Sequence, residues 1–438
     1  MPLNVCGWRI DLNMKTLFFC ARNIRDYLSK VKNIDKLALP DVESFAPELL
    51  DLPSVQKILS SLSTNSDEEI FFDTGVEGLR LDFNCGLRIE IPVGNFHVSI
   101  SDFNTNKKIF DRDLSDVRLI SVEKYFIRWH VEISLDGQKI FCHTFNPEGK
   151  TILLTFDKFG GLGDILAMLP YAKEFAKVFN CRVVINLPKY LQELAANFYP
   201  ELKQVENITP EIYASYNLTM NFGDFPIVPA DIRSTPLNRL GGAILGVSNF
   251  PPKPKFKPTE PRQIAEPYVC IGVQASTAVK GWHWQGGWDI VVSYLKSLGY
   301  RVLCIDKENF QQTGSYINQI PKDAEDFTGN FPIMQRANLL YYAEFFIGLS
   351  SGLSWLANMV NCPVVMICGF SHDWHEFYTP YRVANRLVCN GCYSDIRVRA
   401  FNNFCPYQNG TSRELECQRE ISPRQVLDTI ERLILQLQ

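Results

Sequence analysis

Four cysteines near the C-terminus have the spacing of metal ligands. Cys389 and Cys392 form a CxxC pair, and Cys405 and Cys417 follow it after twelve and eleven intervening residues. Four thiolates can complete the coordination of one Zn or Fe ion, and such a site is structural because no coordination position stays open for a substrate. The spacing therefore predicts a four-cysteine finger at residues 389–417 that holds one metal ion. Unconnected buried thiols and a redox-active CxxC pair are the alternatives.

A glycine-rich turn separates an apolar run from a candidate helix. Gly161 and Gly163 follow the run 152–156, and glycines at such a turn let the backbone approach a ligand closely. Asp164 would stand at the start of the helix, in the crevice where open α/β sheets bind ligands. The alternative role of Asp164 is that of an ordinary helix N-cap. A turn of this kind is by itself a weak signal of a ligand site.

A second cluster, rich in hydroxyl groups, follows another apolar strand. It contains Ser276, Thr277 and Lys280. Hydroxyl groups can donate hydrogen bonds to a pyrophosphate, and a lysine ammonium group supplies a compact positive charge. The alternative is a solvated loop lysine.

A third cluster lies between a further strand and a helix. Ser350, Ser351 and Gly352 occupy the turn, where free backbone N–H groups and the helix dipole can bind an anion. The alternatives are a serine-capped core helix and, because residues 348–352 match GxSxG, the nucleophile turn of a hydrolase. The second and third clusters follow strands of one α/β domain, so they can face the same crevice. Together they predict a site for a nucleotide diphosphate.

The first third of the chain has the pattern of strands. Residues 1–69 form an N-terminal extension to which the sequence assigns no role. From about Gly78 the apolar residues recur with a period of two, which is typical of β-strands. Asp136 and Gly137 favour a tight hairpin turn with positive φ angles. Residues 70–150 are therefore predicted to form a small antiparallel β domain.

Strands and helices alternate in the rest of the chain, which predicts an α/β fold class. A first Rossmann-like domain covers 151–250, and a second covers 268–438 and includes the cysteine finger. Between them, 251–267 contains six prolines in seventeen residues and favours an extended linker. Two such domains leave a cleft between them, which is a favoured place for a small-molecule site. His372 and His375 follow another strand end, where surface or packing roles are expected.

Composition excludes several classes of protein. The 438 residues include 44 Lys and Arg against 48 Asp and Glu, so the net charge of -4 gives no general attraction to nucleic acid or anionic lipid. No run of about 18 apolar residues predicts a membrane-spanning helix. The short apolar patch at 17–21 does not have the length of a signal-peptide core. We therefore expect no membrane insertion, no nucleic-acid partner and a cytoplasmic location.

The order of these clusters resembles that of the bacterial autotransporter heptosyltransferase family, which is related to the heptosyltransferases that build the lipopolysaccharide core. The resemblance covers about residues 70–435. Its most specific segments are 161–164, 266–271, 297–302, 324–329, 346–349, 351–357, 376–380 and the cysteine finger.

The resemblance implies a GT-B fold, in which two Rossmann-like domains enclose a nucleotide-sugar cleft behind a β-rich domain. Enzymes of this family transfer heptose from ADP-heptose to serine hydroxyls of autotransporter adhesins in the cytoplasm. They assemble as rings, for which a dodecamer is expected. The adhesin passenger would then be the protein partner of this chain.

The resemblance also implies roles for single residues. Asp164 is the general base, Lys280 holds the donor phosphates, and the cysteine finger holds iron, with zinc as the alternative. No DxD-like carboxylate pair stands at a strand end, which agrees with transfer without a catalytic metal. The donor-binding residues are then Gly161, Gly163, Ser276, Thr277, Lys280, Ser350, Ser351 and Gly352.

Three other interpretations remain open at this point. The enzyme could be a heptosyl- or hexosyltransferase that acts on lipopolysaccharide or another glycan. A non-catalytic scaffold that binds nucleotide sugars would keep the pocket but tolerate loss of the base. The cysteine finger could be a nucleic-acid module, because arginines lie in and beside it, although the net charge of -4 opposes this interpretation.

Overall fold

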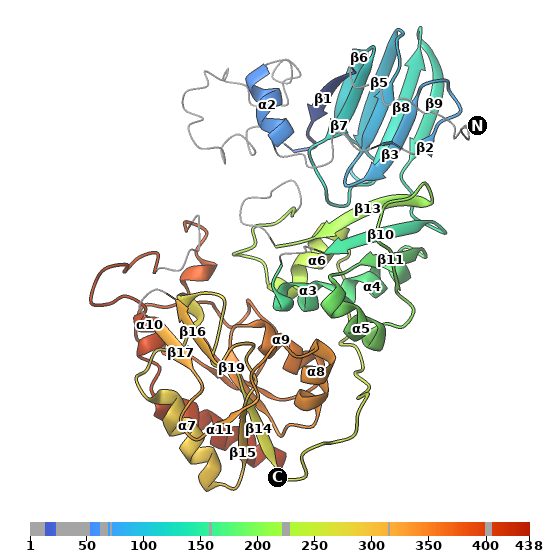
Figure 1. The fold of residues 1–438 in the computed structure, drawn as a ribbon. Helices are drawn as coiled ribbons and strands as arrows, with labels where there is room; N and C mark the ends of the chain where they lie inside the picture. Colours follow the sequence, from blue (N-terminus) through green and yellow to red (C-terminus); the bar gives the residue numbers. More distant parts are fainter. Residues whose placement is uncertain are drawn as a thin grey trace, which may run out of the picture.

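The computed structural model contains three parts that follow one another in space as they do in the sequence (Figure 1). A β part lies at one end, a first α/β part in the middle and a second α/β part at the other end, where the C-terminus lies. The structure describes residues 14–22, 53–61, 69–70, 72–156, 160–220, 228–313, 316–398 and 405–438.

One layer of the β part is a four-stranded antiparallel sheet in the order β6-β5-β8-β9. Val131 and Ile133 alternate with more polar residues along β8 and are fully buried, as the period of two predicts. Asp136 and Gly137 join β8 to β9 with φ angles of 50° and 80°, which confirms the predicted hairpin. The strands are β5 (Phe96–Asp102), β6 (Lys107–Leu114), β8 (Trp129–Leu135) and β9 (Gln138–Thr144).

The other layer of the β part continues directly into the sheet of the first α/β part. Strand β3 pairs with β4 on one side and, in parallel, with β13 on the other, where Phe83 lies opposite Ala214. A single sheet therefore runs in the order β1-β7-β4-β3-β13-β10-β11-β12, with β2 paired to β3. The boundary predicted near residue 150 lies within this continuous sheet. The strands are β1 (Lys15–Phe19), β2 (Phe72–Asp73), β3 (Arg80–Asn84), β4 (Arg88–Ile91), β7 (Val117–Ser121), β10 (Thr151–Phe156), β11 (Arg182–Asn186), β12 (Lys203–Gln204) and β13 (Ile212–Leu218).

The described parts of the N-terminal extension belong to the β part. Strand β1 pairs in parallel with β7, and Phe19 packs against Phe110 and Trp129 of the opposite layer, with ring centroids 5.4 and 6.0 Å apart. Helix α2 (Pro53–Ser61) covers the free edge of β1. Its Gln56 side chain accepts a hydrogen bond from the Phe18 N–H (2.8 Å) and donates one to the Phe18 carbonyl (2.9 Å). The amide of Gln56 thus pairs with β1 as a neighbouring strand would.

The first α/β part places helices beside the parallel strands β13, β10, β11 and β12. The helical segment predicted after the glycine-rich turn is divided into two helices at Leu169 and Pro170, because proline has no N–H for an intrahelical bond and starts a new first turn. The helices are α3 (Leu162–Met168), α4 (Pro170–Val178), α5 (Lys189–Phe198) and α6 (Leu237–Leu245).

The second α/β part is a six-stranded parallel sheet in the order β18-β15-β14-β19-β20-β21. Strands and helices alternate along this part, as the sequence predicts. The strands are β14 (Tyr268–Ile271), β15 (Arg301–Cys304), β18 (Glu325–Asp326), β19 (Phe346–Leu349), β20 (Val364–Ile367) and β21 (Arg382–Val383). The helices are α7 (Gly287–Ser297), α8 (Ile333–Tyr341), α9 (Gly352–Met359), α10 (Glu416–Arg419) and α11 (Pro423–Leu437), and a hairpin is formed by β16 (Phe310–Thr313) and β17 (Tyr316–Gln319).

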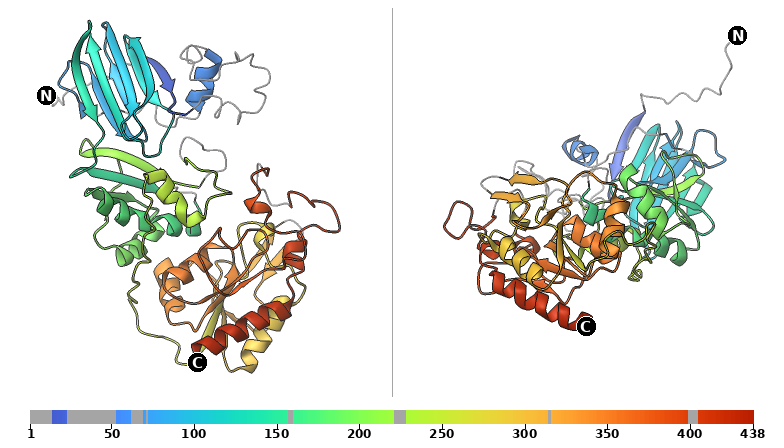
Figure 2. Two further views of the ribbon diagram at one scale, coloured as in Figure 1. Left: turned by 180° about the vertical axis from the view of Figure 1, so that it is seen from behind. Right: turned by 60° about the horizontal axis from the view of Figure 1, so that its bottom comes forward.

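The proline-rich linker runs as an extended strand-like segment along one side of both α/β parts (Figure 2). Side-chain amides from both α/β parts hold the middle of the linker. Asn197 of α5 accepts from the Lys257 N–H (3.1 Å) and donates to its carbonyl (2.7 Å), and Asn338 of α8 accepts from the Thr259 N–H (2.9 Å). In the described part of the chain, no helix has the length and apolarity needed to cross a bilayer.

A buried ion pair stabilises the hairpin of β3 and β4, which lies where the β part joins the first α/β part. Arg88 Nε donates to Asp82 Oδ1 (2.8 Å) and Arg88 Nη2 donates to Asp82 Oδ2 (2.6 Å), and both side chains are almost fully buried. The same guanidinium donates to the Glu69 carbonyl (3.0 Å). Two parallel bonds of this kind fix the geometry of both groups.

We expect Asp82→Ala to lower the free energy of unfolding by about 3–5 kcal/mol, because it removes the buried carboxylate that accepts two hydrogen bonds from the Arg88 guanidinium. Urea denaturation followed by Trp129 fluorescence measures this loss. The matched control is Lys108→Ala, which removes an exposed ion pair with Asp111 and should change stability little. Equal losses in the two variants would contradict the prediction.

Candidate functional site

The largest described cavity is a cleft of about 860 Å³ between the two α/β parts. The first α/β part contributes Leu162 at the start of α3 and three neighbouring residues of α5. The second contributes the ends of several parallel strands and the starts of α8 and α9. The lining includes Leu162, Lys189, Tyr190, Glu193, Ser276, Asp306, Lys307, Phe331, Arg336, Ser351 and Gly352.

Two of the predicted phosphate-binding clusters meet in this cleft. Ser276 follows β14 and Ser351 and Gly352 follow β19, and these two strands are neighbours in the sheet. Within the described structure, the buried oxygens Thr277 Oγ1 and Ser351 Oγ have no hydrogen-bond partner. Buried hydroxyls without a partner are costly unless a ligand satisfies them. The turn after β14 and the turn after β19 therefore share one crevice, as their positions in the sequence predict.

Ser350 and Lys280 have other surroundings. The Ser350 hydroxyl is buried and donates to Glu376 Oε1 (2.5 Å), so this side chain is used inside the second α/β part. Lys280 ends a single 3-10 turn, Ala278–Lys280, with its Nζ 5.9 Å from the centre of the Phe370 ring. Lys280 is half-buried and is not one of the residues that line the cleft.

Glu376 is the centre of a fully buried network. Its carboxylate also accepts from Ser371 Oγ (2.9 Å) and from Arg382 Nη1 (2.8 Å). Burial by itself would raise the pKa of Glu376, but the charge of Arg382 and the hydrogen bonds from Ser350 and Arg382 hold it below the ordinary value. The network therefore keeps a carboxylate ion beneath the turn that leads into α9.

Asp164 lies in the first turn of α3. The N-cap residue is Gly161, whose N–H donates to Asp164 Oδ2 (3.1 Å), so Asp164 occupies the third helical position and not the N-cap. Burial raises the pKa of both Tyr190 and Tyr393, and the charge of Asp164 acts in the same direction. The carboxylate of Asp164 is therefore felt by a tyrosine of α5 and by one of the cysteine-containing segment of the second α/β part.

His375 is buried close to Lys280. Burial lowers the pKa of His375 to about 4, and the Lys280 charge acts in the same direction, so the imidazole is neutral at pH 7. The His375 carbonyl accepts a hydrogen bond from the Leu237 N–H of α6 (2.8 Å). This bond connects the two α/β parts beside the cleft, in agreement with the packing role that the sequence favours.

Asp306 and Arg336 are cleft residues that the sequence analysis missed. Asp306 follows β15 and accepts from the N–H groups of Val273 (2.7 Å) and Gln274 (3.3 Å). Burial raises the pKa of Asp306 to about 6. Arg336 Nη2 donates to the carbonyls of Asp306 (3.2 Å) and Gly329 (3.1 Å). The sequence did contain a signal for Asp306, because an acidic residue directly after an apolar strand occupies the position at which α/β sheets place ligand contacts.

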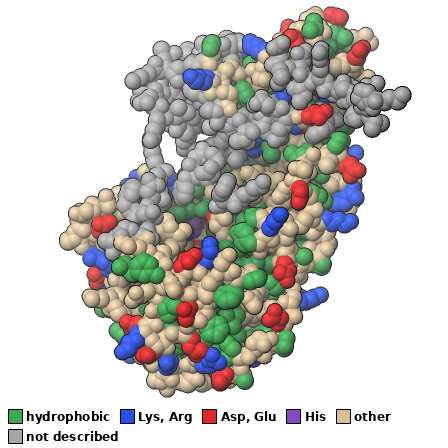
Figure 3. All heavy atoms as spheres, viewed as in Figure 1, with side chains coloured by type: hydrophobic (Ala, Val, Ile, Leu, Met, Phe, Trp, Pro, Cys, Tyr) green, Lys and Arg blue, Asp and Glu red, His purple; other side chains and the backbone are tan. Residues whose placement is uncertain are grey.

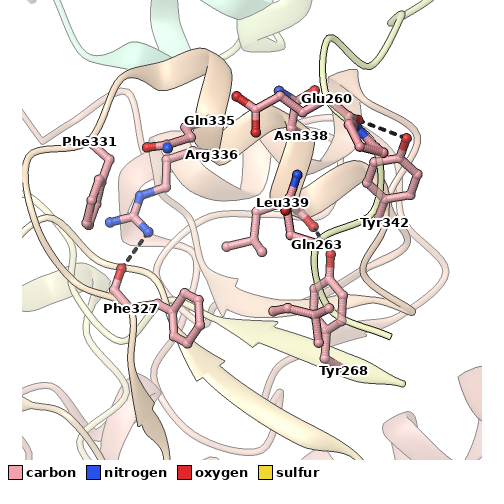
Figure 4. A pocket seen from close by; sticks show the side chains of 12 residues that line it. Glu260, Gln263, Tyr268, Phe327, Phe331, Gln335, Arg336, Asn338, Leu339 and Tyr342 are labelled. Atoms are coloured by element: carbon pink, nitrogen blue, oxygen red, sulfur yellow. Dashed lines mark hydrogen bonds between the residues drawn. The ribbon is translucent and has the colours of Figure 1, made fainter. Parts of the chain in front are cut away.

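A smaller cavity of about 250 Å³ lies behind this part of the cleft (Figure 4). It separates the linker from α8 and shares Phe331 and Arg336 with the cleft. Figure 4 shows the Arg336 guanidinium beside the Phe331 ring, with a hydrogen bond to the Phe327 carbonyl (2.5 Å). Tyr342 donates to the Glu260 carbonyl of the linker (3.1 Å). Arg336 therefore forms a wall between the two cavities.

The four predicted metal ligands are gathered in the second α/β part. Cys392, Cys405 and Cys417 are buried and Cys389 is partly buried. Burial raises the pKa of Cys392 to about 12, and the charges of Cys405 and Cys389 act in the same direction. Burial and the charges of the other finger cysteines likewise raise the pKa of Cys417. A cation would remove this mutual repulsion, so the donor set fits a thiolate-binding ion.

The distances between potential ligand atoms indicate a different group of side chains that could hold a metal ion. Among the residues that the structure describes, no three of the finger sulfurs lie within 4.8 Å of one another, whereas ligand atoms of His130, Glu132 and Cys142 do. The second group lies on β8 and β9, where Lys139 forms an ion pair with Glu132. An ammonium group at this position competes with a metal ion for the carboxylate.

The charges on the molecular surface carry no single sign. On the face shown in Figure 3, Lys and Arg side chains are interspersed with Asp and Glu side chains over all three parts. This distribution agrees with the overall charge of -4. It is typical of a protein whose charged ligands bind locally rather than along a basic surface.

Comparison with known proteins gives consistent matches over most of the chain. A family model described as the N-terminal domain of glycosyltransferase TibC matches residues 75–137. The autotransporter heptosyltransferase BAHTCr of Citrobacter rodentium is 39% identical over 377 residues, which cover 84% of this chain and 92% of that protein. The inactive autotransporter heptosyltransferase BimC of Burkholderia thailandensis is 33% identical, over 82% of this chain and 86% of that protein.

Solved structures give the same result. The crystal structure of the iron-containing dodecameric glycosyltransferase TibC from enterotoxigenic E. coli has a TM-score of 0.81 and 37% identity, and covers 85% of this chain and 99% of that chain. A second TibC structure, in complex with ADP-D-β-D-heptose, has a TM-score of 0.80 and 36% identity, with the same coverage of both chains.

We expect the contribution of Asp306 to stability to fall as pH rises from about 4 to about 6, because its folded-state pKa, about 6, is above the ordinary value of 3.8. Between these two values the folded chain binds this proton more tightly than the unfolded chain does. The difference between the two pKa values corresponds to roughly 3 kcal/mol. Asp306→Asn should remove this part of the pH dependence, which urea denaturation at several pH values measures.

The control for this experiment is Asp326→Asn. Asp326 is exposed, and the hydrogen bonds from Thr328 lower its pKa, so its contribution to the pH dependence has the opposite sign. Only the slopes of the free energy of unfolding against pH are compared. Absolute stabilities also differ, because asparagine at position 306 has one acceptor oxygen where aspartate has two. An unchanged slope in Asp306→Asn would show that Asp306 does not titrate in this range.

Proposed function

Because this chain belongs to the autotransporter heptosyltransferase family, we propose that it transfers heptose from ADP-heptose to serine hydroxyls of an autotransporter adhesin passenger. The observation that carries the proposal is the shared cleft. It brings the helix of Asp164 in one α/β part against two phosphate-binding turns in the other. The two parallel sheets around this cleft form the GT-B fold, and the chain is a glycosyltransferase.

Asp164 is the general base of the proposed reaction. A serine hydroxyl is a weak nucleophile at neutral pH, and a carboxylate that takes its proton as the new C–O bond forms contributes roughly 10²–10⁴-fold. In the first turn of α3, Asp164 has one carboxylate oxygen bonded to the Gly161 N–H. This bond orients the carboxylate that would accept the proton.

The departing ADP gathers negative charge as the sugar bond breaks. The backbone N–H groups at Ser351 and Gly352, together with the hydroxyls of Ser276 and Thr277, would donate hydrogen bonds to its phosphates. Lys280 would supply positive charge from the side of the Phe370 ring. Ser350 would act indirectly, because its bond to Glu376 holds the turn in place.

These groups supply the positive charge that a divalent ion provides in metal-dependent transferases, so we propose transfer without a catalytic metal. A DxD sequence does occur at residues 111–113, but it lies in β6 of the β part. Its two carboxylates form hydrogen bonds with His97. This pair is therefore used structurally, away from the cleft.

The cysteine finger would hold iron, because the related TibC is an iron-containing protein. Cys389, Cys392, Cys405 and Cys417 would be its ligands, and the ion would act as a cross-link for a segment with few apolar residues of its own. By the same relationship we propose a homo-oligomer, with a dodecameric ring as the expected size, and a cytoplasmic site of action before the adhesin is exported.

The name of one relative supports a second candidate function. BimC is described as inactive, so a member of this family can lack the transfer activity. A chain of that kind would bind the nucleotide sugar without using it. A third candidate is transfer to lipopolysaccharide or another glycan, for which the cleft itself gives no separate support.

We expect purified protein to add heptose in steps to an autotransporter passenger fragment in the presence of ADP-heptose. Intact mass spectrometry measures each addition. Asp164→Asn should lower kcat by about 10²–10⁴-fold with little change in donor affinity, because the amide cannot accept the proton. The matched control is Glu148→Gln, which changes an exposed carboxylate in the loop between β9 and β10.

Each outcome of this assay assigns the function. Binding of ADP-heptose without transfer to any acceptor supports the non-catalytic interpretation. Transfer to a lipopolysaccharide acceptor alone overturns the protein acceptor. Full activity of Asp164→Asn overturns the role of the base and leaves the transfer itself in place.

We expect one metal ion per chain, measured by elemental analysis of the purified protein. Cys417→Ser should reduce the metal content strongly, because the finger then offers three thiolates instead of four. The control is Cys142→Ser, which disrupts the alternative group of ligand atoms on β8 and β9. Loss of the metal in the control and not in Cys417→Ser would place the ion in the β part.

A further inference from the structure

Two glycines allow helices α3 and α9 to meet across the boundary between the α/β parts. A Cβ atom built on Gly163 of α3 would lie 2.7 Å from Trp355 Cδ1 of α9. A Cβ atom built on Gly352 of α9 would lie 2.7 Å from Leu162 Cβ of α3. Each helix therefore contributes one glycine and one side chain to a reciprocal contact.

Space, and not backbone conformation, requires glycine at these two positions. Neither Gly163 nor Gly352 has a φ angle in the left-handed region, so the backbone alone would accept any residue. Cβ atoms keep ordinary contacts at 3.4–4 Å, and a separation of 2.7 Å forces one partner to move. Gly163, predicted from the sequence as a donor-binding residue, is thus packed against a tryptophan.

The tryptophan has little freedom to move. Trp355 is 4% exposed and packs edge-on against Phe377, with ring centroids 5.0 Å apart. At the other end of α9, Lys253 of the linker donates to the Asn358 side-chain oxygen (2.6 Å) and to its carbonyl (3.2 Å). Contacts at both ends hold α9 in place, so a clash at Gly163 would displace α3.

The contact joins the starts of two helices that carry residues of the proposed reaction. The residue after Gly163 is Asp164, the proposed base, and α9 begins at Ser351 and Gly352, which line the cleft. We infer that Trp355 is a positioning residue, whose indole sets the distance between the base on α3 and the donor phosphates at the start of α9. This inference rests on the proposed function for its catalytic consequence and on the contact alone for its structural one.

The expected effect of a shift follows from the tolerance of catalytic geometry. Gly163→Ala requires a displacement of about 1 Å to restore an ordinary contact, and a misplacement of that size costs about 10²-fold in rate. We expect kcat to fall by about 10–100-fold. Donor affinity should change less than threefold, because the turns that bind the phosphates all belong to the second α/β part.

The experiment is a double-mutant cycle between Gly163→Ala and Trp355→Ala, measured in kcat, in ADP affinity by calorimetry and in the urea midpoint. In the Trp355→Ala background the clashing atom is absent, so the added Gly163→Ala change should lower neither kcat nor the urea midpoint further. If Trp355→Ala does not fold, Trp355→Met replaces it, because the flexible thioether can move aside.

The control variant is Gly287→Ala, another glycine packed on a tryptophan. A Cβ atom there would lie 2.8 Å from Trp282, inside the second α/β part and away from α3. We expect this variant to lower the urea midpoint but to keep kcat. A loss of kcat in Gly287→Ala as large as in Gly163→Ala would show a general effect of destabilisation and would overturn the positioning role.

Two results would overturn the inference directly. One is an equal effect of Gly163→Ala in both backgrounds, and the other is a wild-type kcat in Gly163→Ala. If wild-type protein transfers no heptose, the proposed function fails. The urea midpoints of the cycle then still show whether Gly163 and Trp355 are coupled, so the two failures are distinguishable.

Discussion

The distance between α3 and α9 is the constraint on which the site depends. The fold places the proposed base and a proposed phosphate-binding turn in different α/β parts, so the proposed reaction requires that two separate sheets keep a fixed distance. Glycine at 163 and at 352 lets the helices touch without intervening side chains, and the backbone bond from Leu237 to His375 adds a second point of contact. The contact between α3 and α9 thus sets the separation of the two α/β parts that enclose the cleft.

Two buried carboxyl groups stabilise the second α/β part around the cleft through their hydrogen bonds. Glu376 remains ionised because Arg382 and two serine hydroxyls surround it, whereas Asp306 is buried with backbone N–H groups and has a raised pKa. The two carboxylates hold the turns after β19 and β14, respectively. Each turn that can receive a phosphate is therefore supported from beneath by an acidic group with satisfied hydrogen bonds.

Local patterns determined how much the sequence could predict. The period of two and the Asp136-Gly137 turn identified the β8–β9 hairpin, and the strand-end serines were placed correctly in one crevice, because parallel strands bring their carboxyl ends to one edge. The parallel pairing of β3 with β13 links residues about 130 positions apart, and no local signal marks it. The glycine at 163 was visible, but its partner Trp355 was not, since packing partners depend on the tertiary structure.

The pairing of β1 with β7 has a consequence for the order in which the chain folds. The ribosome delivers Lys15–Phe19 about a hundred residues before Val117–Ser121, so the first strand must wait for its neighbour while the chain grows. During that interval its apolar residues are open to other chains, and an unpaired strand is a template for aggregation. Helix α2 emerges early, and the Gln56 amide can engage Phe18 before β7 exists. Helix α2 of the extension thus provides β1 with a hydrogen-bonding partner before β7 is synthesised.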